Sequence, residues 1–150
     1  MKALGSLWRS AALAAFLAGA TCGGSGAAAA PSEVLRVSPK TVHFGTRPVW
    51  SFTLKGATVT NTGPASVQLL VTIDSAPDDF SFGLLPGSTC PALEPAPLAP
   101  GEGCEAVMGF RPSDFFAGQR QEARLLATAT DPVTGTVLDT ALITFEARGR

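Results

Sequence analysis

The chain has 150 residues, of which 45% are hydrophobic and 15% are charged, and its formal net charge is −1. This balance, without a basic stripe, excludes nucleic acid as an expected partner and excludes a polybasic membrane-surface patch. The 16 glycines and 12 prolines lie between short apolar runs, and no long helical periodicity follows residue 31. These traits favour an all-β fold with many turns.

The first residues have the pattern of a secretory signal peptide. Lys2 and Arg9 precede an apolar run at 11–18, and small residues follow at 19–21. The run is about ten residues long, whereas a membrane-spanning helix needs about twenty. We therefore expect a signal peptide over residues 1–22 and export to the periplasm, the outer membrane or the exterior.

Cys22 leaves two interpretations open. Residues 17–21 resemble a bacterial lipobox, after which the cysteine is acylated and becomes the mature N-terminus, and the glycine-rich 23–26 would suit a tether. The alternative is ordinary cleavage after the A-x-A site at 18–20. Cleavage within 27–30 would remove Cys22. Contact with a membrane is expected only through a lipid on this cysteine.

Residues 23–32 contain only Gly, Ala, Ser and Pro and predict a flexible linker. Residues 33–150 predict one domain of short strands with alternating apolar residues. The strands are expected at 34–37, 41–45, 50–61, 67–73, 80–82, 104–110, 122–130 and 137–147. The Pro- and Gly-rich residues 84–103 predict a long loop. Seven or eight short strands separated by turns are typical of an immunoglobulin-like β-sandwich.

Several side chains are predicted to shape these strands and turns. Val67, Leu69, Val71 and Ile73 form one apolar face, as do the alternating residues of the strands at 104–110, 122–130 and 137–147. Gly45 and Gly63 are candidates for a positive φ. The Asn61 side chain is expected to hydrogen-bond nearby backbone.

Cys90 and Cys104 are predicted to form a disulfide, because an exported domain folds in an oxidising compartment. The bridge would close a loop of about 15 residues and stabilise the fold by roughly 3 kcal/mol on the chain-entropy model. Two separate buried thiols are the alternative. No metal site is expected, since neither a CxxC pair nor a second histidine accompanies these cysteines.

The sequence contains no recognisable catalytic set. His43 is the only histidine and lies in an expected edge strand, and there is no G-x-S-x-G elbow. Asp74, Asp78 and Asp79 share one turn, but their spacing is not that of an EF-hand loop, so local bonds to the backbone are expected. We therefore expect no enzymatic activity, cofactor or metal.

The remaining candidates have structural explanations. The acids Glu105, Asp114 and Glu122 are scattered, unlike the paired carboxylates of a glycosidase, and are expected to keep the surface soluble. Trp50 is expected to pack in the core or at a sheet edge, with a sugar-binding platform as the alternative. Residues 101–103 read as a turn and not as a phosphate loop, because no lysine follows.

Several short pieces of sequence, in a fixed order, resemble one bacterial family. The pieces are Ser38-Pro39, Phe44-Gly45, Thr58 to Gly63, Phe80, Cys90, Leu98 to Cys104, Phe110-Arg111-Pro112 and Gly149. Over residues 33–150 they resemble the choice-of-anchor D domain, which is similar to the abnormal-spindle and Hydin (ASH) immunoglobulin-like module. The resemblance implies a seven-stranded immunoglobulin-like sandwich in an exported surface or envelope protein.

Together these observations predict an exported, non-enzymatic immunoglobulin-like module of the cell envelope or cell surface. It would bind or scaffold a protein or glycan partner through its loop tips or an exposed sheet edge. The alternative is a periplasmic chaperone-like or assembly factor that acts by strand addition.

Overall fold

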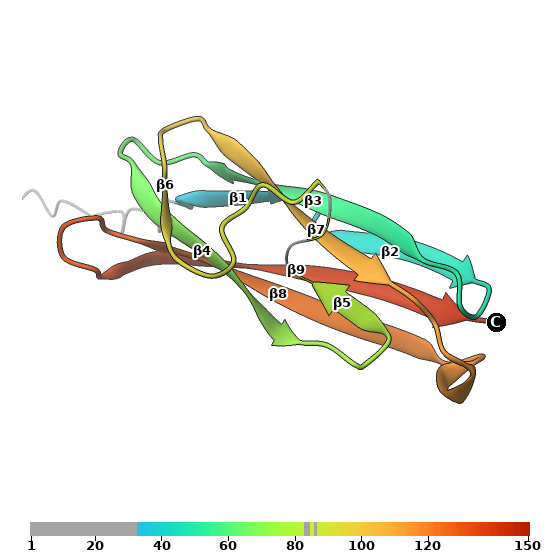
Figure 1. Ribbon diagram of the computed structural model, residues 1–150. Coiled ribbons are helices and arrows are strands. Elements are labelled where there is room, and N and C mark those ends of the chain that lie inside the picture. Colours follow the sequence, from blue (N-terminus) through green and yellow to red (C-terminus); the bar gives the residue numbers. More distant parts are fainter. Residues whose placement is uncertain (1–32, 83–84, 86) are drawn as a thin grey trace, which may run out of the picture. The chain divides into compact units, whose positions relative to one another are not determined.

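The computed structural model describes residues 33–82, 85 and 87–150, and the predicted signal peptide, linker and Cys22 lie outside this part. Nine strands form two packed sheets, and one turn of 3₁₀ helix (η1) lies between β7 and β8 (Figure 1). Their bounds are β1 Leu35–Ser38, β2 Thr41–Arg47, β3 Thr53–Asn61, β4 Val67–Ser75, β5 Phe80–Phe82, β6 Ala96–Leu98, β7 Gly103–Phe110, η1 Asp114–Phe116, β8 Arg120–Thr130 and β9 Val137–Gly149. Across these described ranges, no helix has the length and apolarity to cross a membrane.

The two sheets have four and five strands. One has the order β1-β3-β7-β5 and the other β2-β9-β8-β4-β6. β2 runs parallel to β9, and both point toward the end marked C in Figure 1. The chain changes sheets between β1 and β2, at the cis peptide bond Ser38–Pro39. The predicted all-β immunoglobulin-like sandwich is confirmed.

The core consists of the alternating side chains that the two sheets turn toward each other. The predicted inward faces of β7 and β8 are buried, and four phenylalanine rings meet between the sheets with centroids 4.7–6.2 Å apart. These rings are Phe44, Phe80, Phe110 and Phe145. One expected core residue, Ile73, is 49% exposed because it lies where the register of β4 against β8 shifts.

Two predicted boundaries and one glycine need correction. The strand expected at 50–61 begins only at Thr53, because the Ser51 N–H closes a turn on the Pro48 carbonyl at 3.1 Å. The loop expected at 84–103 contains β6, which pairs with β4. Gly45 has a positive φ, as predicted, with a value of 74°, whereas the φ of Gly63 is not positive. A Cβ at Gly63 would instead lie 3.2 Å from side chains that crowd it.

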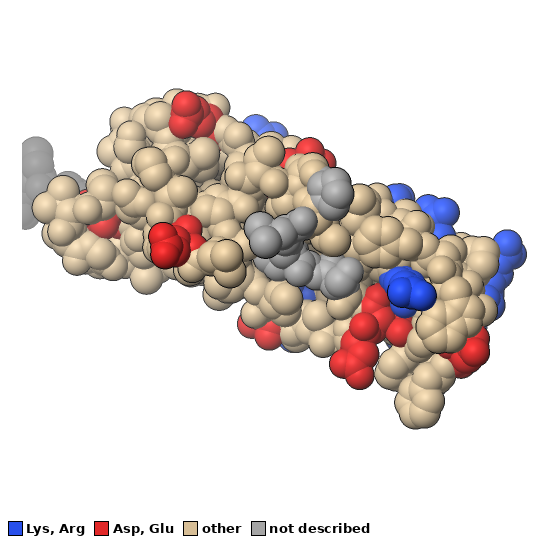
Figure 2. All heavy atoms as spheres, viewed as in Figure 1, with Lys and Arg blue, Asp and Glu red and all other residues tan. Residues whose placement is uncertain are grey.

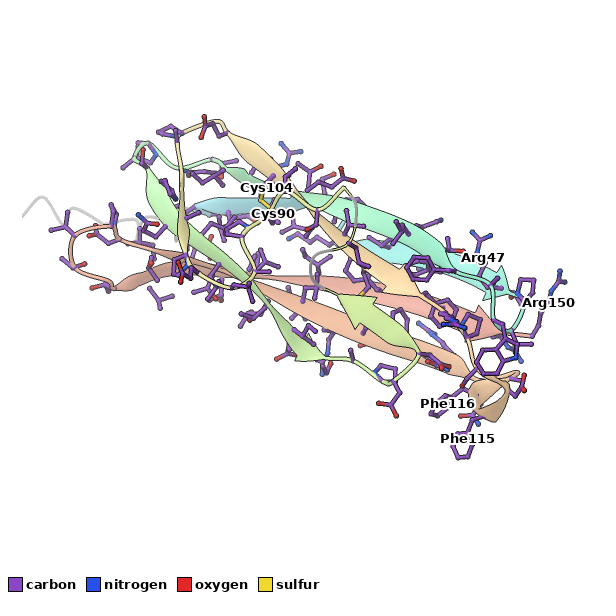
Figure 3. All side chains as sticks on the ribbon, in the orientation of Figure 1. Arg47, Cys90, Cys104, Phe115, Phe116 and Arg150 are labelled. Atoms are coloured by element: carbon purple, nitrogen blue, oxygen red, sulfur yellow. A yellow bond between two sulfur atoms is a disulfide. The ribbon has the colours of Figure 1, made fainter. Side chains whose placement is uncertain are left out.

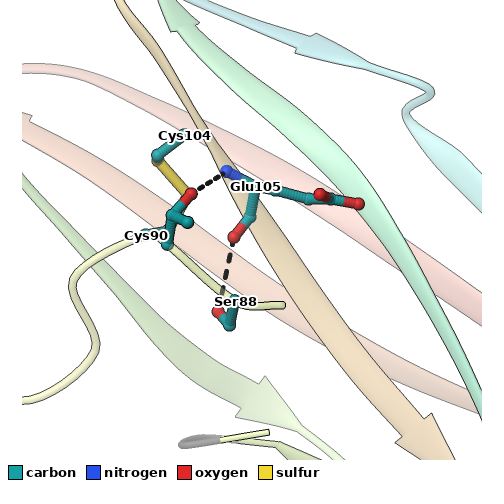
Figure 4. The surroundings of a disulfide bond; sticks show 5 residues. Ser88, Cys90, Cys104 and Glu105 are labelled. Carbon is teal, nitrogen blue, oxygen red and sulfur yellow. Dashed lines mark hydrogen bonds between the residues drawn. A yellow bond between two sulfur atoms is a disulfide. The ribbon is translucent and has the colours of Figure 1, made fainter. Parts of the chain in front are cut away.

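The structure joins Cys90 to Cys104 by a disulfide, with their Cα atoms 4.9 Å apart (Figure 4). The segment before Cys90 lies along β7, since the Glu105 carbonyl accepts the N–H of Thr89 and of Cys90 and the hydroxyl of Ser88. The Pro91 carbonyl then accepts the Val71 N–H at 2.8 Å. The disulfide therefore fixes the chain where it crosses from one sheet to the other.

Asn61 and Asp131 hold two of the turns. Asn61 is fully buried, and its Nδ2 donates to the Ala65 and Leu98 carbonyls at 2.9 Å, so it ties β3 to β6 as well as to the local backbone.

Asp131 closes the β8–β9 hairpin. The backbone N–H groups of Thr134 and Val133 donate to its carboxylate and hold the pKa of Asp131 below its ordinary value of 3.8.

Candidate functional site

Aromatic side chains gather at one end of the sandwich, around the β2–β3 and β7–β8 connections. We call Trp50, Phe52, Phe115 and Phe116, together with Arg111, the aromatic end. They line an open pocket of about 730 Å³, with Asp78, Asp79 and Ser113 as its other polar lining. Figure 3 shows Phe115 and Phe116 at this end, well away from the disulfide.

Trp50 is 58% exposed and has a φ of 63°, in the left-handed region. It occupies the turn closed by Ser51, and its own N–H donates to the Pro112 carbonyl at 2.8 Å. The expectation that Trp50 packs in the core or at a sheet edge is therefore wrong, because the turn directs it away from the sheet before β3 begins. A left-handed conformation costs a non-glycine residue about 1–2 kcal/mol. Such strain is concentrated at functional sites.

Arg111 stacks on this tryptophan. Its guanidinium carbon lies 5.5 Å from the centroid of the Trp50 ring, the geometry of a cation–π contact. Within the described ranges, no carboxylate oxygen lies within 4.0 Å of the Arg111 guanidinium nitrogens. The donors of Arg111 are therefore held over an aromatic face without an internal acidic partner.

Asp79 holds the segment that carries Arg111. This buried carboxylate accepts the Ser113 N–H at 3.2 Å and the Gln121 amide at 2.7 Å, and its backbone carbonyl accepts the Arg111 N–H at 2.9 Å. The Gln121 Oε1 is buried and has no hydrogen-bond partner among the described residues. Asp79 is thus a long-range support of the pocket and not the locally bonded turn residue that the sequence suggests.

Phe115 and Phe116 come from η1. Their rings lie 5.1 Å apart in an edge-to-face pair, and Phe115 is 83% exposed. A cluster of exposed aromatic rings is unusual on a surface that binds nothing. Sequence analysis missed both residues. A Phe-Phe pair in a break between two strands, where polar residues are usual, is the signal that could have revealed them.

Figure 2 shows basic and acidic side chains close together at the right of the view, the end that carries the C-terminus in Figure 1. Arg47 and Arg150 lie at this end in Figure 3. The Arg150 N–H donates to the Arg47 carbonyl at 2.8 Å, and the Arg150 carbonyl accepts the Val49 N–H at 3.0 Å. These bonds fix the Trp50 turn to the chain's last residue, but neither arginine lines the pocket.

The other candidate residues are not brought into this pocket. His43 Nδ1 lies 3.0 Å from Glu146 Oε2, and Glu146 also binds Arg120, so these side chains form a polar row across β2, β9 and β8. Asp74 lies 3.5 Å from Arg124. The described part of the chain contains no group of three or more side chains placed to hold a metal ion.

The three scattered acids also remain apart from the pocket. Glu105 lies in β7, Asp114 in η1 and Glu122 in β8, and none of them lines the pocket at the aromatic end. Glu122 Oε1 lies 3.7 Å from Arg124 Nε. The described residues therefore do not bring these three acids together in that pocket.

No family model matches the chain, and no curated protein matches its sequence. Among solved structures, the chain is similar to the ASH/PapD-like domain 7 of human CEP192, with a TM-score of 0.59, 11% identity, and coverage of 97% of this chain and 98% of that chain. It is also similar to a protein of unknown function from Porphyromonas gingivalis W83, with a TM-score of 0.58 and 17% identity. That match covers 77% of this chain and 47% of the other, so this chain spans under half of that protein. At these identities the likeness shows the fold alone, which is the immunoglobulin-like sandwich of ASH and PapD-like domains.

Proposed function

We propose that the chain is an exported, non-enzymatic immunoglobulin-like module that binds a protein or glycan partner in the bacterial cell envelope or at the cell surface. The observation that carries the proposal is Trp50, exposed in a left-handed conformation with Arg111 stacked on its ring. Export is supported by the signal-peptide pattern of residues 1–22, and the bacterial setting by the resemblance to the choice-of-anchor D domain.

The aromatic end has the physical character of a binding site. The left-handed conformation of Trp50 reduces the stability of the free domain, and the exposed Phe115 ring adds no burial to stabilise it, so both are explained best by a partner that covers them. Tryptophan and arginine are the residues most enriched among side chains that dominate binding energy. The pocket volume of about 730 Å³ lies within the range of ligand sites.

Strand addition has less support than binding at the aromatic end, because the edge strands are short or interrupted. β1 has four residues and β5 has three, while β6 has three and contains Pro97. The longest edge strand, β2, has a register shift between His43 and Gly45. Short strands, proline and bulges are the features that keep an edge from pairing with another strand.

Catalysis has less support as well. Asp79, the buried acid of the pocket, uses both carboxylate oxygens in hydrogen bonds that hold the fold. The remaining polar lining is Asp78, Arg111 and Ser113. These groups, beside aromatic faces, offer stacking and hydrogen bonding to a ligand.

Co-sedimentation of the purified full chain with a cell-envelope fraction of the source bacterium tests the proposal. Phe115→Ala is expected to weaken binding by about tenfold or more, as expected for a dominant contact. Val133→Ala is the matched control, because Val133 is 90% exposed in the β8–β9 hairpin, away from η1. Equal binding by both variants, or equal loss in both, would overturn the proposal.

A further inference from the structure

We infer that the ligand of the aromatic end is a neutral glycan of a few sugar units. This inference rests on the proposed function and names the ligand class of the same site. It is drawn from the shape of the pocket, the balance of its charges, and the kinds of donor and acceptor that line it.

The walls of the pocket are aromatic. Trp50 and Phe52 come from the β2–β3 connection, and Phe115 and Phe116 from η1. The face of an aromatic ring is electron-rich and attracts weakly positive hydrogens, and it is also apolar. The flat, C–H-bearing face of a sugar ring offers both properties to such a wall. The Arg111 guanidinium already stacks on the Trp50 ring, so Trp50 and Arg111 together present a flat surface and a fork of donors.

The exposed charges of the lining are balanced. Arg111 and Asp78 are both exposed, whereas Asp79 is buried and each of its carboxylate oxygens accepts a hydrogen bond from the protein. An anionic ligand would approach the Asp78 carboxylate, and a cationic ligand would approach the Arg111 guanidinium. A hydroxyl group donates and accepts, so a neutral polyhydroxyl ligand can accept from Arg111 and donate to Asp78 at the same time. The lining therefore favours a neutral sugar over a charged ligand.

The lining also disfavours a polypeptide. Proline-rich peptides dock in aromatic grooves, and extended peptides add to sheet edges through main-chain hydrogen bonds. An extended peptide would need a regular edge strand, and the edge strands of this domain are short or bulged. A proline-rich peptide offers carbonyl acceptors but few backbone N–H donors, so the Asp78 carboxylate would be desolvated with less compensation. A sugar hydroxyl avoids this cost.

The pocket walls are fixed before the ligand arrives. The Trp50 N–H donates to the Pro112 carbonyl, and the Asp79 carboxylate accepts the Ser113 N–H, so the two connections are tied to each other and to the turn that precedes β5. Weak stacking contacts give useful affinity only when little ordering is required on binding. The rigidity of the aromatic end therefore matches a ligand bound mainly by stacking.

The first test treats the envelope fraction before co-sedimentation. Periodate cleaves vicinal diols and is expected to abolish binding of the full chain, while protease treatment is expected to leave binding intact. Loss of binding after protease, with binding retained after periodate, would overturn the glycan inference and leave the proposed function standing. Failure of the untreated fraction to bind would instead overturn the proposed function.

The second test uses defined sugars and the fluorescence of Trp50. The chain has two tryptophans, so Trp8→Phe in the full chain leaves Trp50 as the single reporter. Short neutral oligomers of hexoses and N-acetylhexosamines are expected to change its emission saturably. Phe115→Ala is expected to weaken that binding by about tenfold, with Val133→Ala unchanged. Saturable binding of uronic-acid oligomers or proline-rich peptides, with no response to neutral oligomers, would overturn the inference.

Discussion

The backbone conformation and the exposure of Trp50 fit a binding role better than a structural one. Among the described residues it is the only non-glycine with a positive φ. Its ring makes a cation–π contact with Arg111, and the side chain is 58% exposed. A core tryptophan would contribute several kcal/mol to stability, whereas this one contributes little beyond its stacking with Arg111.

Replacing Trp50 by glycine is therefore expected to leave the fold almost as stable. Glycine relieves a strain of about 1–2 kcal/mol in the folded state. Two losses oppose this gain: the added conformational entropy of the unfolded chain and the loss of the cation–π contact each lower the free energy of unfolding by about 0.5–1 kcal/mol. The free energy of unfolding, measured by urea denaturation, should change by less than about 1 kcal/mol, and envelope binding should be lost. A destabilisation of more than about 2 kcal/mol would make Trp50 a structural residue.

Single-residue roles were predictable where they depend on neighbours in the sequence. The hydrogen bonds of Asn61 to nearby backbone are of this kind, whereas the pairing of Cys90 with Cys104, 14 positions apart, was predicted from the expected oxidising compartment. Asp79 was misjudged, because its partners Ser113 and Gln121 lie 34 and 42 positions away. Only the paired sheets bring those residues beside it.

At the scale of elements, alternation predicted the longer strands well. The buried face of β8 follows a strict period of two, which burial in a sandwich enforces, whereas in β7 the predicted inward residues are buried together with Val107 and Gly109. β6 was missed because three residues that include Pro97 have no strand pattern of their own, and only pairing with β4 defines the strand. The 3₁₀ turn that carries Phe115 was missed for a related reason, since one helical turn has no periodicity.

The disulfide is expected to stabilise the crossing between sheets without shaping the binding site. Replacing both Cys90 and Cys104 by alanine should lower the free energy of unfolding by roughly 3 kcal/mol, from the entropy of the 15-residue loop that the bridge closes. Urea denaturation of the double variant and of the reduced parent chain should agree. An unchanged unfolding midpoint in both, or loss of envelope binding in a folded double variant, would contradict this division of roles.

At the scale of the whole molecule, the register of the strands shows at which end of the sandwich the described residues begin. Leu35 pairs with Asn61 at the far end of β3, whereas Thr53, at the near end of β3, pairs with Phe110 just before Arg111. The described chain therefore enters the sandwich at the end opposite the aromatic end.

Intact-mass analysis of the protein from bacterial membranes tests the proposed export. We expect a processed chain that has lost its signal peptide, with a mass that identifies the cleavage site and a deficit of two hydrogens for the disulfide between Cys90 and Cys104. A diacylglycerol mass on Cys22 would distinguish lipid anchoring from free secretion. An unprocessed chain in the cytosol with both thiols free would contradict export.

The most direct test of the account is hydrogen–deuterium exchange of the full chain with and without the envelope fraction, because it locates the contact surface whatever the ligand is. Protection should appear in the β2–β3 connection around Trp50 and in residues 111–117, with little change in the β8–β9 hairpin. Protection confined to the edge strands β1, β2, β5 or β6, with the aromatic end unaffected, would contradict the account and favour strand addition.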